Sequence, residues 1–260
     1  MSGTSHTQHG KYVCALFAIS HFVAGCASIP QPRDYVQVIQ GATVEFDMVW
    51  IPEGGFWIGR TEVTWDEFLR YCDFDENAAV PPGADAVSKP SKPIVPFDRD
   101  WGTGRRPAVG MSFNAAGEYC RWLSLNTGRP YRLPTEAEWA LACGQTGYEP
   151  LDEHAWYARN SENMTQQVGH KKANRHGLYD MLGNLWEYCL NPYDEKEAKR
   201  PVLRGGSWKD PAARVTPQSR LRFDDDWVLA DPNVPPGVWW VPDGDHLGFR
   251  VMRRDDETVN

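Results

Sequence analysis

The chain lacks three features that would point directly to a function: a membrane-spanning run, a basic cluster and a paired-cysteine motif. No apolar segment is long enough to cross a bilayer as a stable helix. Lys and Arg total 27 against 35 Asp and Glu, without a basic cluster, which argues against a nucleic-acid partner. No two cysteines have the CxxC spacing, so the sequence does not indicate a zinc or thioredoxin-like site.

Tryptophan, glycine and proline are abundant instead. The 260 residues include 12 Trp, 23 Gly and 20 Pro. Trp buries a large apolar surface, and its N–H needs a partner inside a protein. This composition predicts a compact, loop-rich fold that is held together by aromatic packing more than by long regular elements.

The N-terminus resembles a bacterial export signal. Its apolar stretch, residues 12–25, is too short for a stable membrane anchor and is typical of a signal sequence. It ends in VAGC at residues 23–26, which resembles a lipobox, where Cys26 becomes the lipidated first residue. A plain secretory signal is the alternative. We therefore predict export to the periplasm or outer cell envelope, with membrane attachment only through a lipid on Cys26.

Four cysteines follow the signal: Cys72, Cys120, Cys143 and Cys189. Export would allow them to form disulfides. Most of them lie beside apolar residues on expected helix faces, which favours buried, free thiols that pack as small hydrophobic groups.

Capping motifs predict three helices. Thr64 and Glu67, like Thr135 and Glu138, have the spacing of a capping box, in which the two side chains satisfy free backbone donors. The expected helices begin at residue 64, at 112–114 and at 135, and the last two end at Gly128 and Gly144.

Alternating apolar residues over 35–59 predict short strands that are broken at 52–55. Residues 79–106, rich in Pro, Gly, Asp and Lys, predict a surface loop that folds over a groove.

Ordered motifs make the chain similar to one known family. They are EVTWDEF at 62–68, RPAV at 106–109 with the helix at 116–123, YRLPTEAEW at 131–139, NRHGLYDMLGNLWEY at 174–188, RGGSW at 204–208 and GFR at 248–250. In these runs the chain resembles the formylglycine-generating enzyme, or sulfatase-modifying factor, family. The resemblance implies an irregular α+β fold related to C-type lectins, with little regular secondary structure. It places one domain at 44–254, after a signal at 1–26 and a tether with a first strand at 27–43.

The resemblance also implies a calcium site. In the family, a carboxylate or amide, two backbone carbonyls and a Glu hold the ion, and the matching positions are Asp180, the carbonyls of Gly183 and Leu185, and Glu187. Calcium takes six to eight oxygen ligands, so these groups suit it. The alternative is a capped turn with a salt bridge from Glu187. A second family site would begin at 160–161, but its partner acid has no match.

Other polar groups permit two interpretations. Arg204 and Arg250 either pair with buried acids or bind a substrate carboxylate, and a structural pair is favoured. The acidic run FDDDW at 223–227 either lines a groove or binds a cation, or it is a solvated loop.

The family's copper chemistry has no matching residues. The oxidase binds copper through two cysteines after its RGGS motif, and thiolates suit Cu(I). Here the matching positions are near Asp210 and Val215, and no cysteine follows Cys189. Iron is not expected either, because the four histidines beyond the signal show no metal-ligand spacing and most are expected to be solvated.

We therefore predict a calcium-stabilised binding or structural module of the cell envelope, without copper-dependent formylglycine-generating activity and without an assigned catalytic residue. Its expected partner is a peptide, protein or glycan in a surface groove. One alternative is an envelope enzyme of this family that acts on a protein or peptide by other chemistry. Another is a lipoprotein scaffold within an envelope machine.

Overall fold

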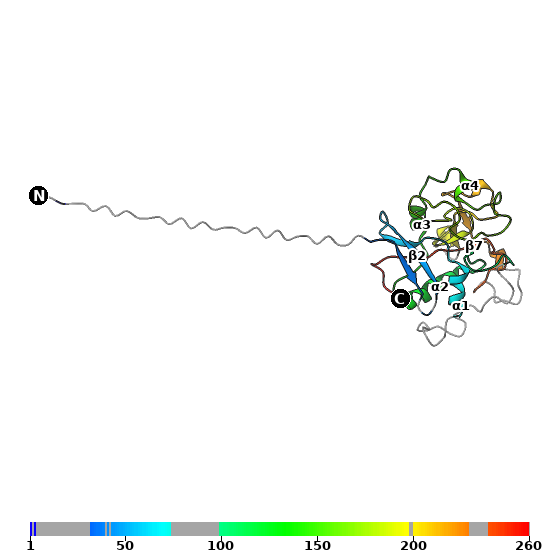
Figure 1. Cartoon of the computed structure of the whole chain (residues 1–260), viewed down its shortest axis with the longest axis horizontal. Coiled ribbons are helices and arrows are strands. Elements are labelled where there is room, and N and C mark those ends of the chain that lie inside the picture. The colour runs from blue at the N-terminus through cyan, green and yellow to red at the C-terminus, as the bar shows by residue number, and fades with distance from the viewer. Residues whose placement is uncertain are drawn as a thin grey trace. The chain divides into compact units, whose positions relative to one another are not determined.

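A computed structural model divides the chain into residues Met1–Gln31 and one compact unit, Pro32–Asn260 (Figure 1). The structure describes residues 1, 3, 32–39, 41, 43–73, 99–197, 200–228 and 239–259. Cys26 with most of the expected export signal, and most of the loop expected at 79–106, lie outside these ranges. None of the helices in the described part is long and apolar enough to cross a membrane.

One antiparallel sheet contains the strands expected near the start of the domain. Its order is β1-β2-β3-β8, from β1 (Tyr35–Val38), β2 (Glu45–Ile51), β3 (Phe56–Gly59) and β8 (Met252–Arg253). Phe46 and Met48 on β2 are buried and alternate with exposed acids, which is the period of a half-buried strand. The break expected at 52–55 is the turn between β2 and β3.

A second sheet has the order β6-β5-β4-β7, from β4 (Trp186–Pro192), β5 (Pro201–Arg204), β6 (Arg220–Arg222) and β7 (Leu247–Gly248). The β4–β7 pair is parallel and the others are antiparallel. Residues 249–251 lead from β7 in this sheet to β8 in the other. This short link therefore fastens the two sheets together.

The three expected helices are confirmed, and a short fourth one follows them. They are α1 (Trp65–Asp73), α2 (Phe113–Thr127), α3 (Glu136–Cys143) and α4 (Leu151–His154). Ser112 caps the start of α2, and Gly128 ends it in a left-handed conformation. Single 3-10 turns cover Glu195–Glu197, Ala212–Arg214 and Asp225–Val228.

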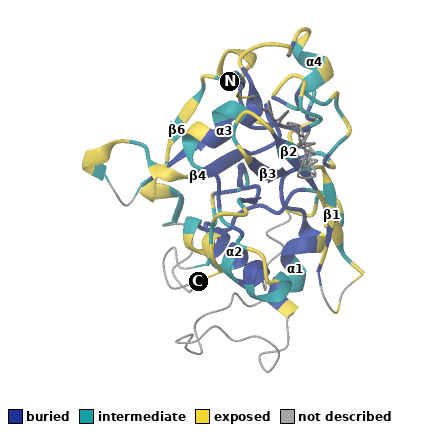
Figure 2. Ribbon diagram, turned by 90° about the vertical axis from the view of Figure 1, so that its left-hand side faces the viewer, coloured by how far each residue is buried: buried dark blue, intermediate teal, exposed yellow. Residues whose placement is uncertain are grey.

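Both views place the strands across the middle of the unit, with α1 and α2 on one side and α3 and α4 on the other (Figures 1 and 2). Aromatic rings fill the core beside α1, where Phe68 lies 5.8 Å from Tyr119 and 5.7 Å from Trp240 between ring centroids. The four cysteines after the signal are buried and free, as expected. These features confirm an irregular α+β fold with short helices and small sheets.

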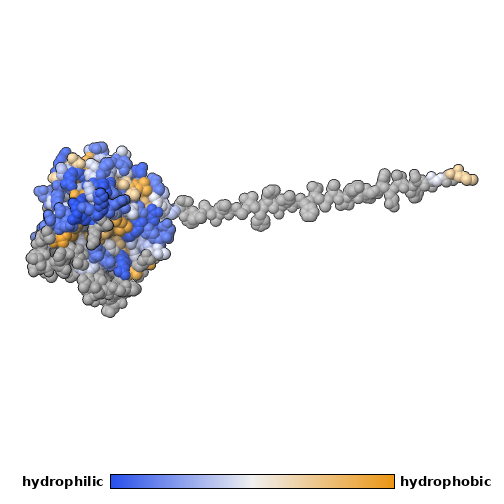
Figure 3. All heavy atoms as spheres, turned by 180° about the vertical axis from the view of Figure 1, so that it is seen from behind, coloured by the Kyte–Doolittle hydropathy of each residue, from blue (hydrophilic) through white to orange (hydrophobic). Residues whose placement is uncertain are grey.

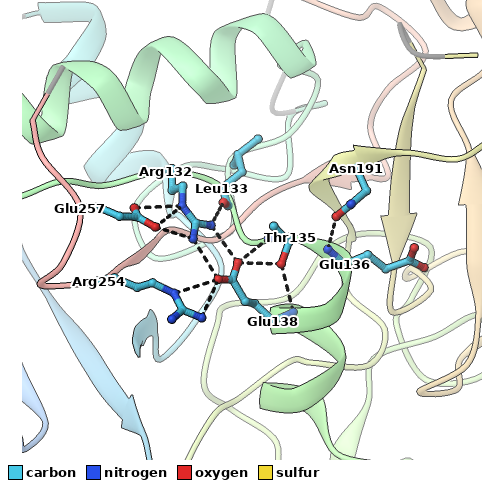
Figure 4. Close-up of polar contacts among 8 residues, drawn as sticks. All are labelled: Arg132, Leu133, Thr135, Glu136, Glu138, Asn191, Arg254 and Glu257. Atoms are coloured by element: carbon cyan, nitrogen blue, oxygen red, sulfur yellow. Dashed lines mark hydrogen bonds and ion pairs between the residues drawn. The ribbon is translucent and has the colours of Figure 1, made fainter. Parts of the chain in front are cut away.

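The start of α3 is tied to the segment that follows β8 (Figure 4). Arg132 donates from Nη1 to Glu138 Oε2 at 2.8 Å and from Nη2 to Glu257 Oε1 at 2.8 Å. Arg254 reaches Glu138 from the same side, at 3.1 Å. Burial alone would raise the pKa of Glu138, but hydrogen bonds from Arg132 and Thr135 hold that pKa at about 2.

Candidate functional site

The turn that leads into β4 carries the residues expected to hold calcium. Asp180 and Asn184 both have a φ of 54°, in the left-handed region, where short polar side chains are tolerated best. Gly183 also has positive φ, and a Cβ there would lie 2.1 Å from the carbonyl oxygen of Trp156. Only glycine suits that position, so the turn is fixed by its close approach to Trp156.

Glu187 forms the salt bridge that was the alternative to calcium. Arg250 donates to it through Nε at 2.7 Å and Nη2 at 2.6 Å, and Trp139 Nε1 donates to its Oε2 at 2.8 Å. The side chains of Glu187 and Arg250 are 1% and 0% exposed. Arg250 also donates to the backbone oxygens of Gly59 and Tyr179. Both carboxylate oxygens of Glu187 are therefore occupied.

Asp180 is buried beside this pair, and one of its oxygens is unsatisfied. Its Oδ2 accepts from the Gly169 N–H at 2.7 Å. Its Oδ1 is buried without a hydrogen-bond partner among the described residues. Burial raises the pKa of Asp180, because the charged form is poorly solvated there.

Glu62 is a third buried carboxylate, which the sequence did not single out although it opens the motif at 62–68. Its Oε1 accepts from the Leu185 N–H at 3.0 Å, and its Oε2 accepts from Asn184 Nδ2 at 2.8 Å. Burial raises its pKa well above the usual value, and the nearby charges of Asp180 and Glu187 add to the rise. Three carboxyl groups thus share the guanidinium of Arg250, so without a further cation the protonated forms of Asp180 and Glu62 are favoured.

The expected calcium ligands fit the ion in part. The open Oδ1 of Asp180 is a hard oxygen of the kind that calcium takes. Glu187 is committed to Arg250. Within the described ranges, no group of three His, Cys, Asp or Glu side chains is arranged to hold a metal ion.

The positions that match the copper cysteines hold a buried carboxylate and a buried apolar residue. Asp210 is 6% exposed and Val215 is 1% exposed. Asp210 Oδ2 accepts from Trp186 Nε1 at 2.7 Å and from Ser207 Oγ at 2.5 Å. These bonds give Asp210 a structural role in place of soft-ligand chemistry.

The remaining candidates have structural partners or are exposed. Arg204 pairs with Glu136 at 2.6 Å, so it forms the structural pair that the sequence favoured. In the acidic run, Asp225 pairs with Arg200. Asn160 holds a local turn by accepting from the Tyr157 N–H at 2.9 Å.

The histidines differ in burial. His154, His170 and His176 are partly or fully exposed, whereas His246 is 3% exposed. Burial lowers the pKa of His246, whose ring lies 4.8 Å from Trp227 between centroids. Among the described residues, His246 belongs to no group of three His, Cys, Asp or Glu side chains that could hold a metal ion.

Known proteins share this sequence pattern. A family model described as "Sulfatase-modifying factor enzyme 1-like domain" matches residues 42–228. An "Inactive C-alpha-formylglycine-generating enzyme 2" of Mus musculus is 33% identical, over 42% of this chain and 42% of its own. "Chaperone protein LppX" of Paenibacillus barcinonensis is 28% identical over 56% of this chain and 57% of its own. A "Formylglycine-generating enzyme" of Streptomyces coelicolor is 33% identical over 41% of this chain and 44% of its own.

The chain thus spans between two fifths and three fifths of the length of these curated relatives. Solved structures are similar over a larger share. "Treponema denticola variable protein 1" superposes with a TM-score of 0.61 at 22% identity, over 86% of this chain and all of that one. PvdO from Pseudomonas aeruginosa gives 0.54 at 24% identity, over 76% and 80% of the two chains. At these identities the likeness shows the fold alone.

Proposed function

This chain belongs to the sulfatase-modifying factor enzyme 1-like family, and we propose that it is a non-catalytic member that binds a ligand. The observation that carries the proposal is Asp210, whose carboxylate is held by Trp186 and Ser207 where the oxidase would have a copper-binding thiol. Its partner position, Val215, is buried and has no ligand atom in its side chain. A relative named inactive and another named a chaperone support a binding role.

We further propose that the protein acts at the bacterial cell envelope, attached by a lipid on Cys26. The lipobox-like ending of its N-terminal segment supports this location. The proposed ligand is a peptide, protein or glycan. Metabolic labelling with a fatty-acid analogue tests the anchor, because Cys26→Ala is expected to abolish incorporation, whereas Cys14→Ala keeps it.

The decisive experiment for the non-catalytic role measures formylglycine. The chain from Ala27 onward is incubated with Cu(I) and a sulfatase-motif peptide, beside an active family oxidase as the positive control. We expect no conversion and no Cu(I) binding. The double variant Asp210→Cys, Val215→Cys is expected to gain Cu(I) binding, because it places soft thiolate ligands at the two positions that match the oxidase's cysteines. Formylglycine made by the unaltered chain would refute the proposal.

We propose that calcium stabilises the turn at 180–187. The unsatisfied Oδ1 of Asp180 and the surplus of carboxylates around Arg250 support a bound cation. The ion pair of Glu187 speaks against that residue as a ligand in the same state. If calcium binds, adding it after chelation raises the melting temperature, and Asp180→Asn reduces this gain.

Glu187→Ala is the comparison variant for the calcium test with Asp180→Asn. It is expected to lower the melting temperature with or without calcium, because it leaves the Arg250 charge buried and unpaired. The informative quantity is therefore the calcium-dependent gain and not the melting temperature itself. An equal gain in the unaltered chain and in both variants would show that calcium binds elsewhere.

A further inference from the structure

A polar cavity borders the buried cluster through Gly169 and Tyr179, which bond to Asp180 and Arg250. Its lining includes neither Asp210 nor the Glu187–Arg250 pair. Its volume is about 500 Å³, within the range of small-molecule sites. Side chains from β2, from the first turn of α1 and from the segment at 168–170 line it. The charged groups in its lining include Asp47, Arg60, Glu67 and Arg105.

Two of these groups already neutralise each other. Arg60 donates from Nε to Asp47 Oδ2 at 2.9 Å and from Nη2 to Asp34 Oδ2 at 3.2 Å. Its Nη1 donates to the carbonyl oxygen of Gly177 at 3.0 Å. The guanidinium of Arg60 is therefore already bonded on all three nitrogens, and the Arg60–Asp47 pair has little hydrogen-bonding capacity left for a ligand.

Arg105 differs from Arg60, because hydrogen bonds fix its backbone while its side chain remains available to a ligand. Its carbonyl oxygen accepts from the Val168 N–H at 3.1 Å. The carbonyls on either side accept from α1, Gly104 from the Asp66 N–H at 3.1 Å and Arg106 from the Trp65 N–H at 2.9 Å. The Arg105 guanidinium is exposed and makes neither a hydrogen bond nor an ion pair with any described residue.

Glu67 supplies the opposite charge on the α1 side of the cavity. It is only 4% exposed, and its Oε1 closes the capping box by accepting from Thr64 Oγ1 at 2.7 Å. Its Oε2 has no hydrogen-bond partner in the described part of the chain. The charge of Arg105 acts on this carboxyl and lowers its pKa against the larger effect of burial.

We infer that the cavity binds a zwitterionic ligand, an amino acid or a short peptide, whose carboxylate pairs with Arg105 and whose ammonium donates to Glu67 Oε2. A guanidinium pairs with a carboxylate through two parallel hydrogen bonds, which adds geometric specificity. The second oxygen of the Glu67 carboxylate remains able to accept, and a charged donor forms a stronger hydrogen bond with a carboxylate than a neutral one does. This inference deepens the proposed function and rests on it, because it gives the binding module a ligand chemistry.

Isothermal titration of the chain from Ala27 onward with a glycine series tests the inference. We expect glycine, diglycine or triglycine to bind, and their relative affinities separate a free amino acid from a peptide. Glycinamide lacks the carboxylate and N-acetylglycine lacks the ammonium, so each is expected to bind about tenfold more weakly or worse. Equal binding of the blocked compounds, or no binding of any zwitterion at millimolar concentration, overturns the inference.

Two variants test the two proposed contacts, and a third is their control. Arg105→Ala is expected to weaken the zwitterion about tenfold or more, since it removes the charged partner of the carboxylate. Arg175→Ala is the matched control, because Arg175 is exposed and lies outside this cavity, and its partners are its neighbour His176 at 3.0 Å and Glu53 at 3.8 Å.

Glu67→Gln keeps an oxygen for the Thr64 cap and is expected to weaken diglycine but not N-acetylglycine. Unchanged binding in both Arg105→Ala and Glu67→Gln overturns the inference. The formylglycine assay is independent of these contacts, so a failure here is distinguishable from a failure of the non-catalytic proposal.

Discussion

At the scale of single residues, the molecule buries one arginine–glutamate ion pair almost completely. Arg250 and Glu187 are nearly inaccessible and satisfy each other through two hydrogen bonds. A buried pair of this kind adds little net stability, but the loss of one partner is costly because the other charge stays buried. The same residues that complete the family motifs therefore serve the fold.

Glu187→Gln tests this consequence. We expect the free energy of unfolding to fall by about 3–5 kcal/mol, because Arg250 keeps its charge without a carboxylate. Urea denaturation at neutral pH measures the change. Glu197→Gln is the surface control, where the partly exposed pairs with Arg222 and Arg200 are expected to contribute about 1 kcal/mol or less each. Similar losses in both variants would contradict the buried-pair argument.

Glu67 predicts a pH dependence of stability. Burial raises the pKa of Glu67 from 4.5 to about 7, so between these values the folded protein binds more protons than the unfolded chain. Stability is then lost as the pH rises from 4.5 to 7.

Glu67→Gln removes this penalty. The variant is expected to gain up to roughly 3 kcal/mol relative to the unaltered chain at pH 8, and little at pH 5. Urea denaturation at the two pH values measures the difference. The same gain at both would show that the carboxyl is ionised in the fold throughout this range.

At the scale of elements, the local signals in the sequence predicted the helices well and the long-range contacts poorly. Capping boxes and Gly128 act within one turn, so Thr64, Ser112 and Thr135 marked the helix starts correctly. The parallel β4–β7 pair joins residues some sixty positions apart, and no local pattern encodes it.

The residues of the candidate site were likewise predicted where the signal was local and missed where it was long-range. Asp180 and Glu187 were placed by their motif, and the structure brings them to one buried cluster. Glu62 and Arg250 complete that cluster from distant parts of the chain. The sequence could not reveal their mutual approach, because it depends on how the two sheets meet.

Thr135→Ala tests the cap of α3. The side chain of Thr135 accepts from the Glu138 N–H at 3.3 Å and donates to the Glu138 carboxylate at 2.8 Å. Its loss is expected to cost about 1 kcal/mol, measured by thermal or urea denaturation. Thr135→Ser retains the hydroxyl and should keep most of the stability. An equal loss in the two variants would assign the effect to the methyl group instead.

At the scale of the whole molecule, a polar surface encloses a core rich in aromatic side chains. The face in Figure 3 is mainly hydrophilic, with scattered apolar patches, in agreement with a net charge of -8. The four buried cysteines report on the integrity of this core, since burial raises the thiol pKa of Cys143 to about 12 and that of Cys189 well above its usual value.

Thiol labelling therefore follows global unfolding. In the folded chain from Ala27 onward, we expect an aromatic disulfide reagent to leave all four cysteines unmodified over the time of a normal assay. Denaturant without a reducing agent is expected to release four reactive thiols together, because one core protects them. Two or fewer reactive thiols would show that the protein carries a disulfide.

The link between the sheets also determines when folding can be completed. Strand β3 needs β8 and strand β4 needs β7, and both partners are synthesised after every other strand. Until residues 247–253 have been made, Glu187 has no Arg250 to neutralise it. Burying Glu187 in the growing chain would therefore leave its charge unpaired. We therefore expect the domain to complete its folding only after translation, and such a delay would suit the export proposed above.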